Sequence, residues 1–382
     1  MKLRAFLLAA LLLTGCASVP APPREPLFND AWFAAPSQRI EAGGIFAASP
    51  EMKRYLATDI ARDATVKGAQ QGLFDALYSR NQLQLEYDSE ITRTAAQAFA
   101  ARAGNCLSLV IMTAAFAKEM DLTVRYQHIY IDETWSRTGD LYLSIGHVNL
   151  TLGNRRNGNL PGPYEADLLT IDFIPPSNVR SMRSRVIDET IIVAMYMNNR
   201  AVESIAAGQL DDAYWWTREA IAQDAGFASS YNTLGAIYQR HGNPDAAEGV
   251  LRYALAWEPE NTRVMSNLVT VLDALGRTAE AAELRRRLAR LEPDPPFSFF
   301  NRGLAAMRAG DYELAKAMFS KEVDRAPYYH EFHFWLAAAC VGLGDYDLAR
   351  EHMAIAMQES PTRGDRDLYA AKLARINAHR SK

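Results

Sequence analysis

A 34-residue repeat in the second half of this 382-residue chain restricts what that half can fold into. Glycine, alanine and proline each recur at this spacing in their own register, from Gly208 to Gly344, from Ala213 to Ala349 and from Pro259 to Pro361. The glycine allows a left-handed turn at the end of one helix, and the proline ends the next helix. The small alanine lets the two helices pack closely. The repeat therefore predicts stacked helix pairs from about residue 193 onward.

The stretch LGAIYQRHGNPDAAEGVLRYALAWEPEN, residues 234–261, is the clearest copy of the unit. Its length and its glycine, alanine and proline positions resemble the tetratricopeptide repeat, a helix–turn–helix unit. The resemblance implies an all-α solenoid of five repeats over residues 193–361, closed by a capping helix over residues 362–382. Such arrays bind a peptide or a protein along the concave face that the first helices build.

Polar residues on the repeats suggest partner or metal sites. Asn199, Asn267 and Asn301 occupy equivalent positions on the first helices of three repeats. These side chains could hold the backbone of an extended peptide, or they could be solvated helix residues. His330 and His333 stand one helical turn apart, which suits a metal ion, but the sequence offers no third ligand. We therefore expect polar residues at a helix start there, and neither a metal nor a cofactor.

The N-terminus has the order of a secretory signal. Lys2 and Arg4 precede the apolar run AFLLAALLL, which is too short to span a bilayer as a stable helix. The following LTGC resembles the lipobox of bacterial lipoproteins, which implies removal of residues 1–15 and lipidation of Cys16. Ala17 differs from the aspartate of an inner-membrane retention signal. We therefore expect a lipid anchor in the outer membrane of the cell envelope, facing the periplasm.

The Pro-rich stretch ASVPAPPREP follows the predicted anchor and indicates a tether over residues 16–45. The chain has 45 acidic and 41 basic residues, a balance that does not suggest a nucleic-acid groove. If Cys16 is lipidated, Cys106 and Cys340 remain, and they lie in different halves of the chain. We expect both to be free thiols, with Cys340 packed among the small residues of LAAACVGLG.

Residues 46–180 have a different pattern, with helices first and strands afterwards. SPEMKRYLATDIARDA starts with a capping serine, Ser49, and with Pro50 at the first helical position. Further helices are predicted for TVKGAQQGLFDALYS, for TRTAAQAFAARAG and for the run from Cys106 to about Met120. VRYQHIYI, LYLSIGHVNLTL and LLTIDFI are rich in β-branched and aromatic residues and predict strands, the last two separated by the turn-rich NRRNGNLPGP. This order predicts an α+β domain with an antiparallel sheet.

Cys106 points to function, because an unpaired thiol in an exported protein is open to oxidation. It follows Gly104 and Asn105 at the start of an apolar helix, where the positive end of the helix dipole favours the nucleophilic thiolate. A catalytic thiolate also needs an imidazole that moves protons and a carboxylate or amide that orients the imidazole. His147, in the middle of a predicted strand, and Asp172, near the end of the next strand, fit these two roles.

Other interpretations of these residues stay open. His128, on the preceding strand, is a rival base. Cys106 could be a small buried helix residue, His147 a hydrogen-bonded sheet histidine, and Asp172 the cap of a turn before FIPP. The order helix, strand and neighbouring strand favours the assembled triad.

The segments around these residues, GNCLSLVIMTAAFAKEMDL, GHVNL and IDF, resemble the transglutaminase-like superfamily of papain-like cysteine enzymes. The upstream YDSEITRTAAQAFAARAGNC is similar too, so the resemblance covers about residues 85–175. It implies Cys106 as nucleophile, His147 as general base and acid, Asp172 as the residue that orients the histidine, and thioester chemistry on an amide. Val148 differs from the pattern, because the cross-linking members often carry an aromatic residue after the histidine.

The expected activity follows from this resemblance. The backbone amide of Cys106 is a natural donor to an oxyanion, and Asn105 or Gln127 could assist. We expect a membrane-anchored, exported cysteine hydrolase or acyltransferase that acts on peptide or isopeptide amides, with hydrolysis favoured because no amine site is visible. Its repeats would bind a protein or peptide partner. The alternative is a non-catalytic envelope scaffold whose repeats mediate protein–protein interaction, and a Cys106→Ala substitution separates the two.

Overall fold

The structure is a computed structural model, and it describes residues 27–78, 83, 85–88, 91–130, 135–138, 141–144, 147–154, 168–173, 183–327, 329–360 and 362–378. The predicted signal peptide, the predicted lipidation site Cys16 and most of the turn-rich loop at 154–163 lie outside the described residues. Within the described residues, no helix combines the length and the apolar character that crossing a membrane requires.

The first domain begins with helices, as the sequence predicts. Ser49 caps the first of them, because its Oγ accepts the N–H of Met52 at 3.2 Å, and Pro50 is the first helical residue. The helices of this domain are α1 (Pro50–Tyr55), which continues through the π-helical η2 (Leu56–Ile60) into α2 (Ala61–Lys67), then α3 (Ala69–Tyr78), α4 (Ala95–Ala101) and α5 (Cys106–Glu119). α5 is apolar on all sides and is buried from Cys106 to Ala117, so it forms the centre of the domain.

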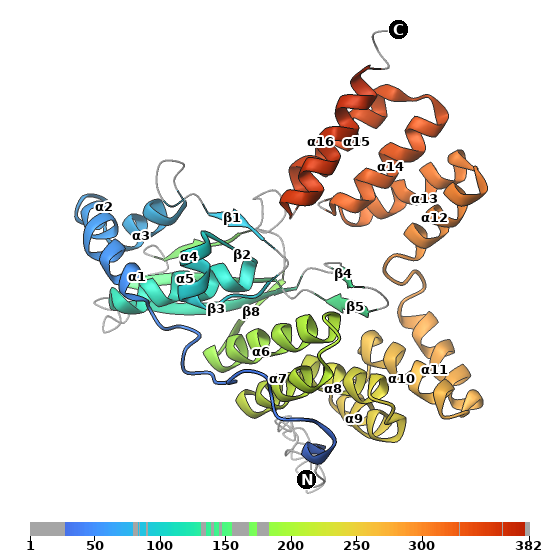
Figure 1. Cartoon of the computed structure of the whole chain (residues 1–382), viewed down its shortest axis with the longest axis horizontal. Helices are drawn as coiled ribbons and strands as arrows, with labels where there is room; N and C mark the ends of the chain where they lie inside the picture. The colour runs from blue at the N-terminus through green and yellow to red at the C-terminus, as the bar shows by residue number, and fades with distance from the viewer. Residues whose placement is uncertain are drawn as a thin grey trace, which may run out of the picture.

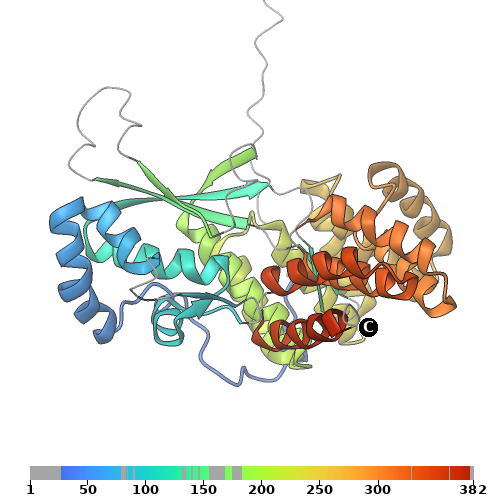
Figure 2. The same ribbon diagram turned by 90° about the horizontal axis from the view of Figure 1, so that it is seen from above.

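A four-stranded antiparallel sheet packs against α5. Its order is β7 (Leu169–Ile171), β6 (His147–Asn154), β3 (Leu122–Tyr130) and β8 (Arg183–Ile187). Figure 2 shows these strands as a layer on one side of the teal helix α5. Val148, Leu150 and Leu152 alternate along β6 and join the core against the helix. Two small ladders lie outside this sheet, β1 (Glu86–Tyr87) with β2 (Ala103–Gly104) and β4 (Trp135–Thr138) with β5 (Leu141–Ser144).

Three local predictions differ from the structure. The strand predicted over 141–152 is divided into β5 and β6, so His147 is the first residue of a strand and not a mid-strand residue. The helix predicted to end at Gly104 ends at Ala101, and its C-cap Arg102 takes the left-handed conformation at φ 50°. The edge strand β8 was not predicted, because the first three of its five residues, Arg183, Ser184 and Arg185, are polar and give no strand signal.

The second half of the chain is a series of helix pairs (Figure 1). The periodic glycines all have positive φ, between 72° and 85°, and each periodic alanine is fully buried, as their spacing predicts. The helices are α6 (Glu189–Ala206), α7 (Leu210–Gln223), α8 (Ala228–Arg240), α9 (Pro244–Trp257), α10 (Thr262–Ala274), α11 (Thr278–Leu291), α12 (Ser298–Ala309), α13 (Tyr312–Arg325), α14 (His330–Leu343), α15 (Tyr346–Glu359) and α16 (Arg363–Ala378).

The hydrophobic cores do not follow the boundary between the two halves. Ile192 and Met197 of α6 and Trp216 of α7 belong to the same buried cluster as Met112 of α5 and Leu150 of β6. The first repeat is therefore part of the core of the first domain. This shared core holds the array and the domain together.

The array itself is divided into two packed blocks. One buried cluster extends from Phe33 to Ala281, and another contains only residues between Phe297 and Ile376. The link between α11 and α12 carries the prolines of EPDPP, and Phe297 after it has a left-handed φ of 61°. Figure 1 shows this link as an irregular segment between the two helical blocks. The blocks share a sequence period but not a core.

The segment that precedes the first domain is bound to the array. The ring of Phe33 stacks on Tyr214 at 4.0 Å between centroids, and Trp215 Nε1 donates to the carbonyl of Ala34 at 2.6 Å. The N–H and hydroxyl of Ser37 donate to Asp212 at 2.7 and 2.5 Å. These residues, within the predicted tether of 16–45, attach the chain to α7.

Two glycines in one helix pair offer a matched test of repeat packing. A Cβ at Gly235 of α8 would lie 2.6 Å from Leu251 Cγ on α9, whereas a Cβ at Gly249 of α9 would meet nothing within 4 Å. We expect Gly235→Ala to lower the free energy of unfolding by about 1–3 kcal/mol through overpacking. Gly249→Ala should raise it by about 0.5–1 kcal/mol through helix propensity. Urea denaturation measures both, and effects of the same sign and size would contradict the packing.

Candidate functional site

The thiol of Cys106 lies at the first position of α5. Asn105 is the N-cap, and its Oδ1 accepts the N–H of Ser108 at 2.9 Å and the Ser108 hydroxyl at 2.8 Å. Cys106 is 6% exposed, and it and Cys340 are both free cysteines. The prediction of a free thiol at a helix start is therefore confirmed.

His147 and Asp172 meet across β6 and β7. His147 Nε2 and Asp172 Oδ1 are 2.7 Å apart, and Asn149 Nδ2 donates to Asp172 Oδ2 at 2.8 Å. The antiparallel register explains this contact, because it places Asp172, directly after β7, beside Asn149. Both carboxylate oxygens are thus engaged, which fixes the orientation of the group that holds the imidazole.

The environment of His147 favours the protonated imidazole. Burial lowers the pKa of His147, but the hydrogen bond with Asp172 and the contact with the Cys106 thiol outweigh burial and raise it to about 9. Asp172 engages Nε2, so Nδ1 is the remaining ring nitrogen. It is buried and has no hydrogen-bond partner among the described residues. The structure therefore brings His147 and Asp172 into contact and places Cys106 close enough to raise the pKa of the imidazole.

Tyr87 is a further residue at the thiol, and the sequence analysis missed it. β1 pairs in parallel with β2, and Tyr87 lies opposite Gly104, close to the start of α5. Cys106 Sγ and Tyr87 Oη are 3.7 Å apart, which is within hydrogen-bonding distance for sulfur. The nearby Cys106 sulfur and the burial of the Tyr87 hydroxyl hold the pKa of Tyr87 well above its usual value. The hydroxyl therefore stays protonated, although 39% of the residue as a whole is exposed. A ladder of two residues leaves no periodic signal in the sequence.

The two side chains predicted to assist an oxyanion make other hydrogen bonds. Asn105 Nδ2 donates to Thr92 Oγ1 at 2.9 Å. Gln127, on β3, donates through Nε2 to Thr151 Oγ1 at 3.2 Å. Both side-chain amides therefore make hydrogen bonds within the domain. Of the three oxyanion donors that the sequence predicts, the backbone N–H of Cys106 at the start of α5 fits that role best.

His128, the rival base, lies on β3 opposite Val148 and Arg185. Burial lowers the pKa of His128, and the charges of Arg185, His147 and Arg263 lower it further. His128 is therefore neutral at pH 7, whereas the carboxylate of Asp172 contacts His147.

The predicted partner-binding asparagines lie in three different environments. Asn199 Nδ2 donates to Thr92 Oγ1 at 3.3 Å, so its amide faces the first domain. Asn267 Nδ2 donates to Asn232 Oδ1 at 2.8 Å, between two first helices of the array. Asn301, on α12, is exposed. The three asparagines therefore do not share one kind of contact, and of the three only Asn301 is exposed.

The histidines of the last repeat contact protein groups. His333 Nδ1 and His352 Nδ1 are 2.9 Å apart, and His330 Nδ1 is 2.8 Å from the Tyr369 hydroxyl. In the part of the chain that the structure describes, no three His, Cys, Asp or Glu side chains gather where they could hold a metal ion.

An open hollow of about 660 Å³ lies beside α1 and α4, away from the thiol. Glu51, Tyr55, Asp59, Gln97 and Arg102 contribute its polar lining. Neither Cys106 nor His147 is among its described lining residues, so the hollow and the thiol are separate features.

Family models of the tetratricopeptide repeat match residues 238–297 and 300–363. These ranges cover the helix pairs from the end of α8 to α15. The second half of the chain therefore contains tetratricopeptide repeats, as its period predicts. No curated protein matches the chain.

One solved structure with similar repeats is a thermophilic tetratricopeptide protein of Thermus thermophilus, which is 18% identical in sequence. The match covers 48% of this chain and 99% of that protein, with a TM-score of 0.30. PilF of Pseudomonas aeruginosa has 21% identity, with 51% of this chain and 88% of its own covered and a TM-score of 0.30. PilW, a type IV pilus biogenesis factor, has 19% identity, with 49% and 86% covered and a TM-score of 0.28. At these sequence identities and TM-scores, the similarity concerns the helical repeats alone and says nothing about function.

The raised pKa of His147 makes a prediction for stability. The folded pKa of about 9 exceeds the unfolded value of about 6.5. The contribution of His147 is therefore fully present below pH 6.5 and is lost as the pH rises through 9. We expect wild type to exceed His147→Gln in free energy of unfolding by about 3 kcal/mol more at pH 6 than at pH 10. Urea denaturation at both values checks this, and a difference that is independent of pH would contradict it.

Proposed function

We propose that the chain is a protein-binding scaffold that holds a peptide or protein partner along the first helices of its repeats. The observation that supports this most strongly is the tetratricopeptide match over residues 238–297 and 300–363. The Asn267–Asn232 hydrogen bond joins two neighbouring first helices, and Asn301 is exposed further along the array. Amides on this surface can pair with the backbone of an extended segment.

Site-specific photocrosslinking in the cell envelope tests this proposal. A photoreactive residue at position 301 would lie on a first helix, and one at position 286, on the exposed side of α11, is the matched control. We expect a discrete protein adduct from position 301 and none from position 286. Equal labelling at the two positions, or none at either, would count against binding along the first helices.

A second function is favoured by one specific observation, the arrangement of Cys106, His147 and Asp172. Support comes from the 2.7 Å contact between His147 Nε2 and Asp172 Oδ1 and from the thiol that raises the pKa of the same imidazole. These residues match the roles that the transglutaminase-like resemblance assigns. The second proposal is therefore that residues 46–180 form a transglutaminase-like domain with cysteine-dependent amide chemistry.

The proposed reaction proceeds through a thioester. The Cys106 thiolate attacks the carbonyl carbon of a peptide or isopeptide amide, and the N–H of Cys106 stabilises the oxyanion. The C–N bond breaks while the imidazolium of His147 gives its proton to the leaving amine. Water then attacks the thioester, and His147 takes the proton of that water. The C–S bond breaks, the carboxylic acid leaves, and the Cys106 thiolate is regenerated beside the protonated His147. An amine in place of water would give acyl transfer instead. Asp172 orients the ring throughout.

The location of this chemistry is also a proposal. The LTGC segment supports a lipid anchor at Cys16 in the outer membrane, facing the periplasm. The repeats would then present an extended segment of an exported partner to the thiol. Membrane fractionation of wild type and Cys16→Ser tests the anchor, because the variant should leave the membrane fraction.

A Cys106→Ala strain separates the two functions. If the strain behaves like a deletion strain while crosslinking at position 301 persists, catalysis is required in addition to binding. If the strain behaves like wild type, the scaffold accounts for the function. Cys340→Ala is the matched control, because Cys340 is buried in the last repeat, far along the chain from the proposed site.

A further inference from the structure

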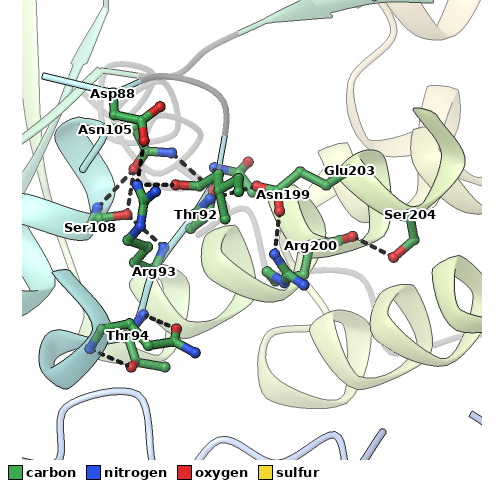
Figure 3. A network of polar contacts seen from close by, with 12 residues as sticks. Asp88, Thr92, Arg93, Thr94, Asn105, Ser108, Asn199, Arg200, Glu203 and Ser204 are labelled. Carbon is green, nitrogen blue, oxygen red and sulfur yellow. Dashed lines mark hydrogen bonds and ion pairs between the residues drawn. The ribbon is translucent and has the colours of Figure 1, made fainter. Parts of the chain in front are cut away.

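The first helix of the array is connected to the thiol site through one buried threonine. Thr92 precedes α4, is 2% exposed and lies between Asn105 and Asn199 (Figure 3). Its N–H donates to Glu203 Oε1 at 2.7 Å, and its Oγ1 accepts the amides of Asn199 at 3.3 Å and Asn105 at 2.9 Å. Thr92 thus joins α6 of the array to the N-cap of α5.

The capacity of the Thr92 hydroxyl to accept hydrogen bonds is fully used. A hydroxyl oxygen accepts two hydrogen bonds and donates one. The amides of Asn199 and Asn105 occupy both acceptor positions. Burial raises the pKa of Glu203, while Arg200 and Thr92 oppose this effect. A satisfied buried network of this kind holds each of its members in one position.

On the thiol side, Asn105 links this network to Cys106. Its Nδ2 is held by Thr92, and its Oδ1 caps the N–H of Ser108. Ser108 Oγ in turn accepts the N–H of Arg93 at 2.8 Å. The first turn of α5 is therefore attached to Thr92 and to its neighbour. Cys106 follows Asn105 directly, so the direction of its side chain and of its N–H depends on this cap.

On the array side, α6 is held firmly enough to act as a support. Glu203 pairs with Arg200, with Nη1 and Oε2 2.5 Å apart, and Ser204 donates to the carbonyl of Arg200. The buried side chains of α6, such as Ile192 and Met197, lie in the core of the first domain. The network therefore connects two elements that are both fixed by packing.

We propose that Thr92 is a positioning residue for the Cys106 thiol, and that Asn199 and Glu203 make α6 a structural part of the thiol site. This inference rests on the proposed cysteine chemistry. It adds that the array does more than bind a partner, because α6 holds the cap of α5 in position through Thr92. The reactivity of a thiol can be measured without a substrate, which makes the proposal testable now.

The test compares Thr92→Val, which removes the hydroxyl but keeps the shape, with Thr92→Ser, which keeps the hydroxyl. Iodoacetamide alkylation of the full chain is followed from pH 6 to pH 10. The masses of the tryptic peptides 103–118 and 326–350 report Cys106 and Cys340 separately. We expect Thr92→Val to lower the alkylation rate of Cys106 about tenfold at neutral pH, as for the loss of a buried hydrogen bond. Thr92→Ser should retain the rate, and Cys340 should not change.

The outcomes separate this inference from the proposed chemistry. A wild-type Cys106 that reacts much faster than Cys340, with an unchanged pH–rate profile in Thr92→Val, overturns the positioning role alone. A wild-type Cys106 no more reactive than Cys340 overturns the cysteine chemistry and the positioning role together. If Thr92→Val does not fold, as its thermal transition would show, Glu203→Gln decides. A slowed and shifted profile for Cys106 supports the proposal, and an unchanged profile overturns it.

Discussion

Truncation after Asp188, which removes every repeat, will unfold the first domain. α6 and α7 contribute large buried side chains to its core: Ile192, Val193, Met195, Tyr196, Met197 and Trp216. Full burial of one such side chain is worth about 1.5–3 kcal/mol, so the loss is on the order of 10 kcal/mol. That is comparable with the whole stability of a domain, about 5–15 kcal/mol. We expect the truncated chain to be insoluble, or to lack a cooperative transition in circular dichroism.

A second truncation, after Glu292, is the matched control. It removes α12 to α16, whose buried cluster contains only residues between Phe297 and Ile376 and has no member in common with the core of the first domain. The shortened chain keeps α6 to α11 and should melt cooperatively. If both truncations fold equally well, the shared core contributes little. If both fail, the last block supports the domain in a way that packing does not explain.

The features that the sequence predicted correctly are those that repeat or that act locally. The positive φ of Gly208 and the buried Ala213 recur at the same spacing in each unit, so the helix pairs could be predicted by counting. Ser49 caps the helix that follows it, because its side chain reaches the backbone N–H of Met52, only three residues away. The place of the thiol at a helix start followed from one such local signal.

The features that the sequence did not predict depend on contacts between distant segments. Tyr87 reaches the thiol through a two-residue parallel ladder, which has no periodicity. Thr92 meets Glu203 and Asn199, more than a hundred residues away, in a polar network that no spacing rule describes. The packing of Trp216 into the first domain also has no local signal, because a core-facing aromatic residue looks the same whichever domain it enters.

The reactivity of Cys106 is the second large effect that we expect, and His147 should control it. An imidazolium beside the thiol stabilises the thiolate, which is the form that iodoacetamide alkylates. His147 keeps its proton up to about pH 9, so at neutral pH an imidazolium stands beside the thiol and should raise its alkylation rate. A free thiol is only about 1% thiolate at pH 6.5. We therefore expect His147→Ala to slow alkylation of Cys106 by up to about 100-fold at pH 6.5.

Two comparisons within the same chain make this result specific. Cys340 is buried in the last repeat, and burial raises its pKa, so it should react slowly and equally in wild type and His147→Ala. Asp172→Asn keeps a hydrogen-bonding group beside His147 but removes the charge that favours the imidazolium, so a smaller loss of about tenfold is expected. A Cys106 that reacts at the same rate with and without His147 would mean that the histidine does not activate the thiol. The protein would then act through its repeats alone.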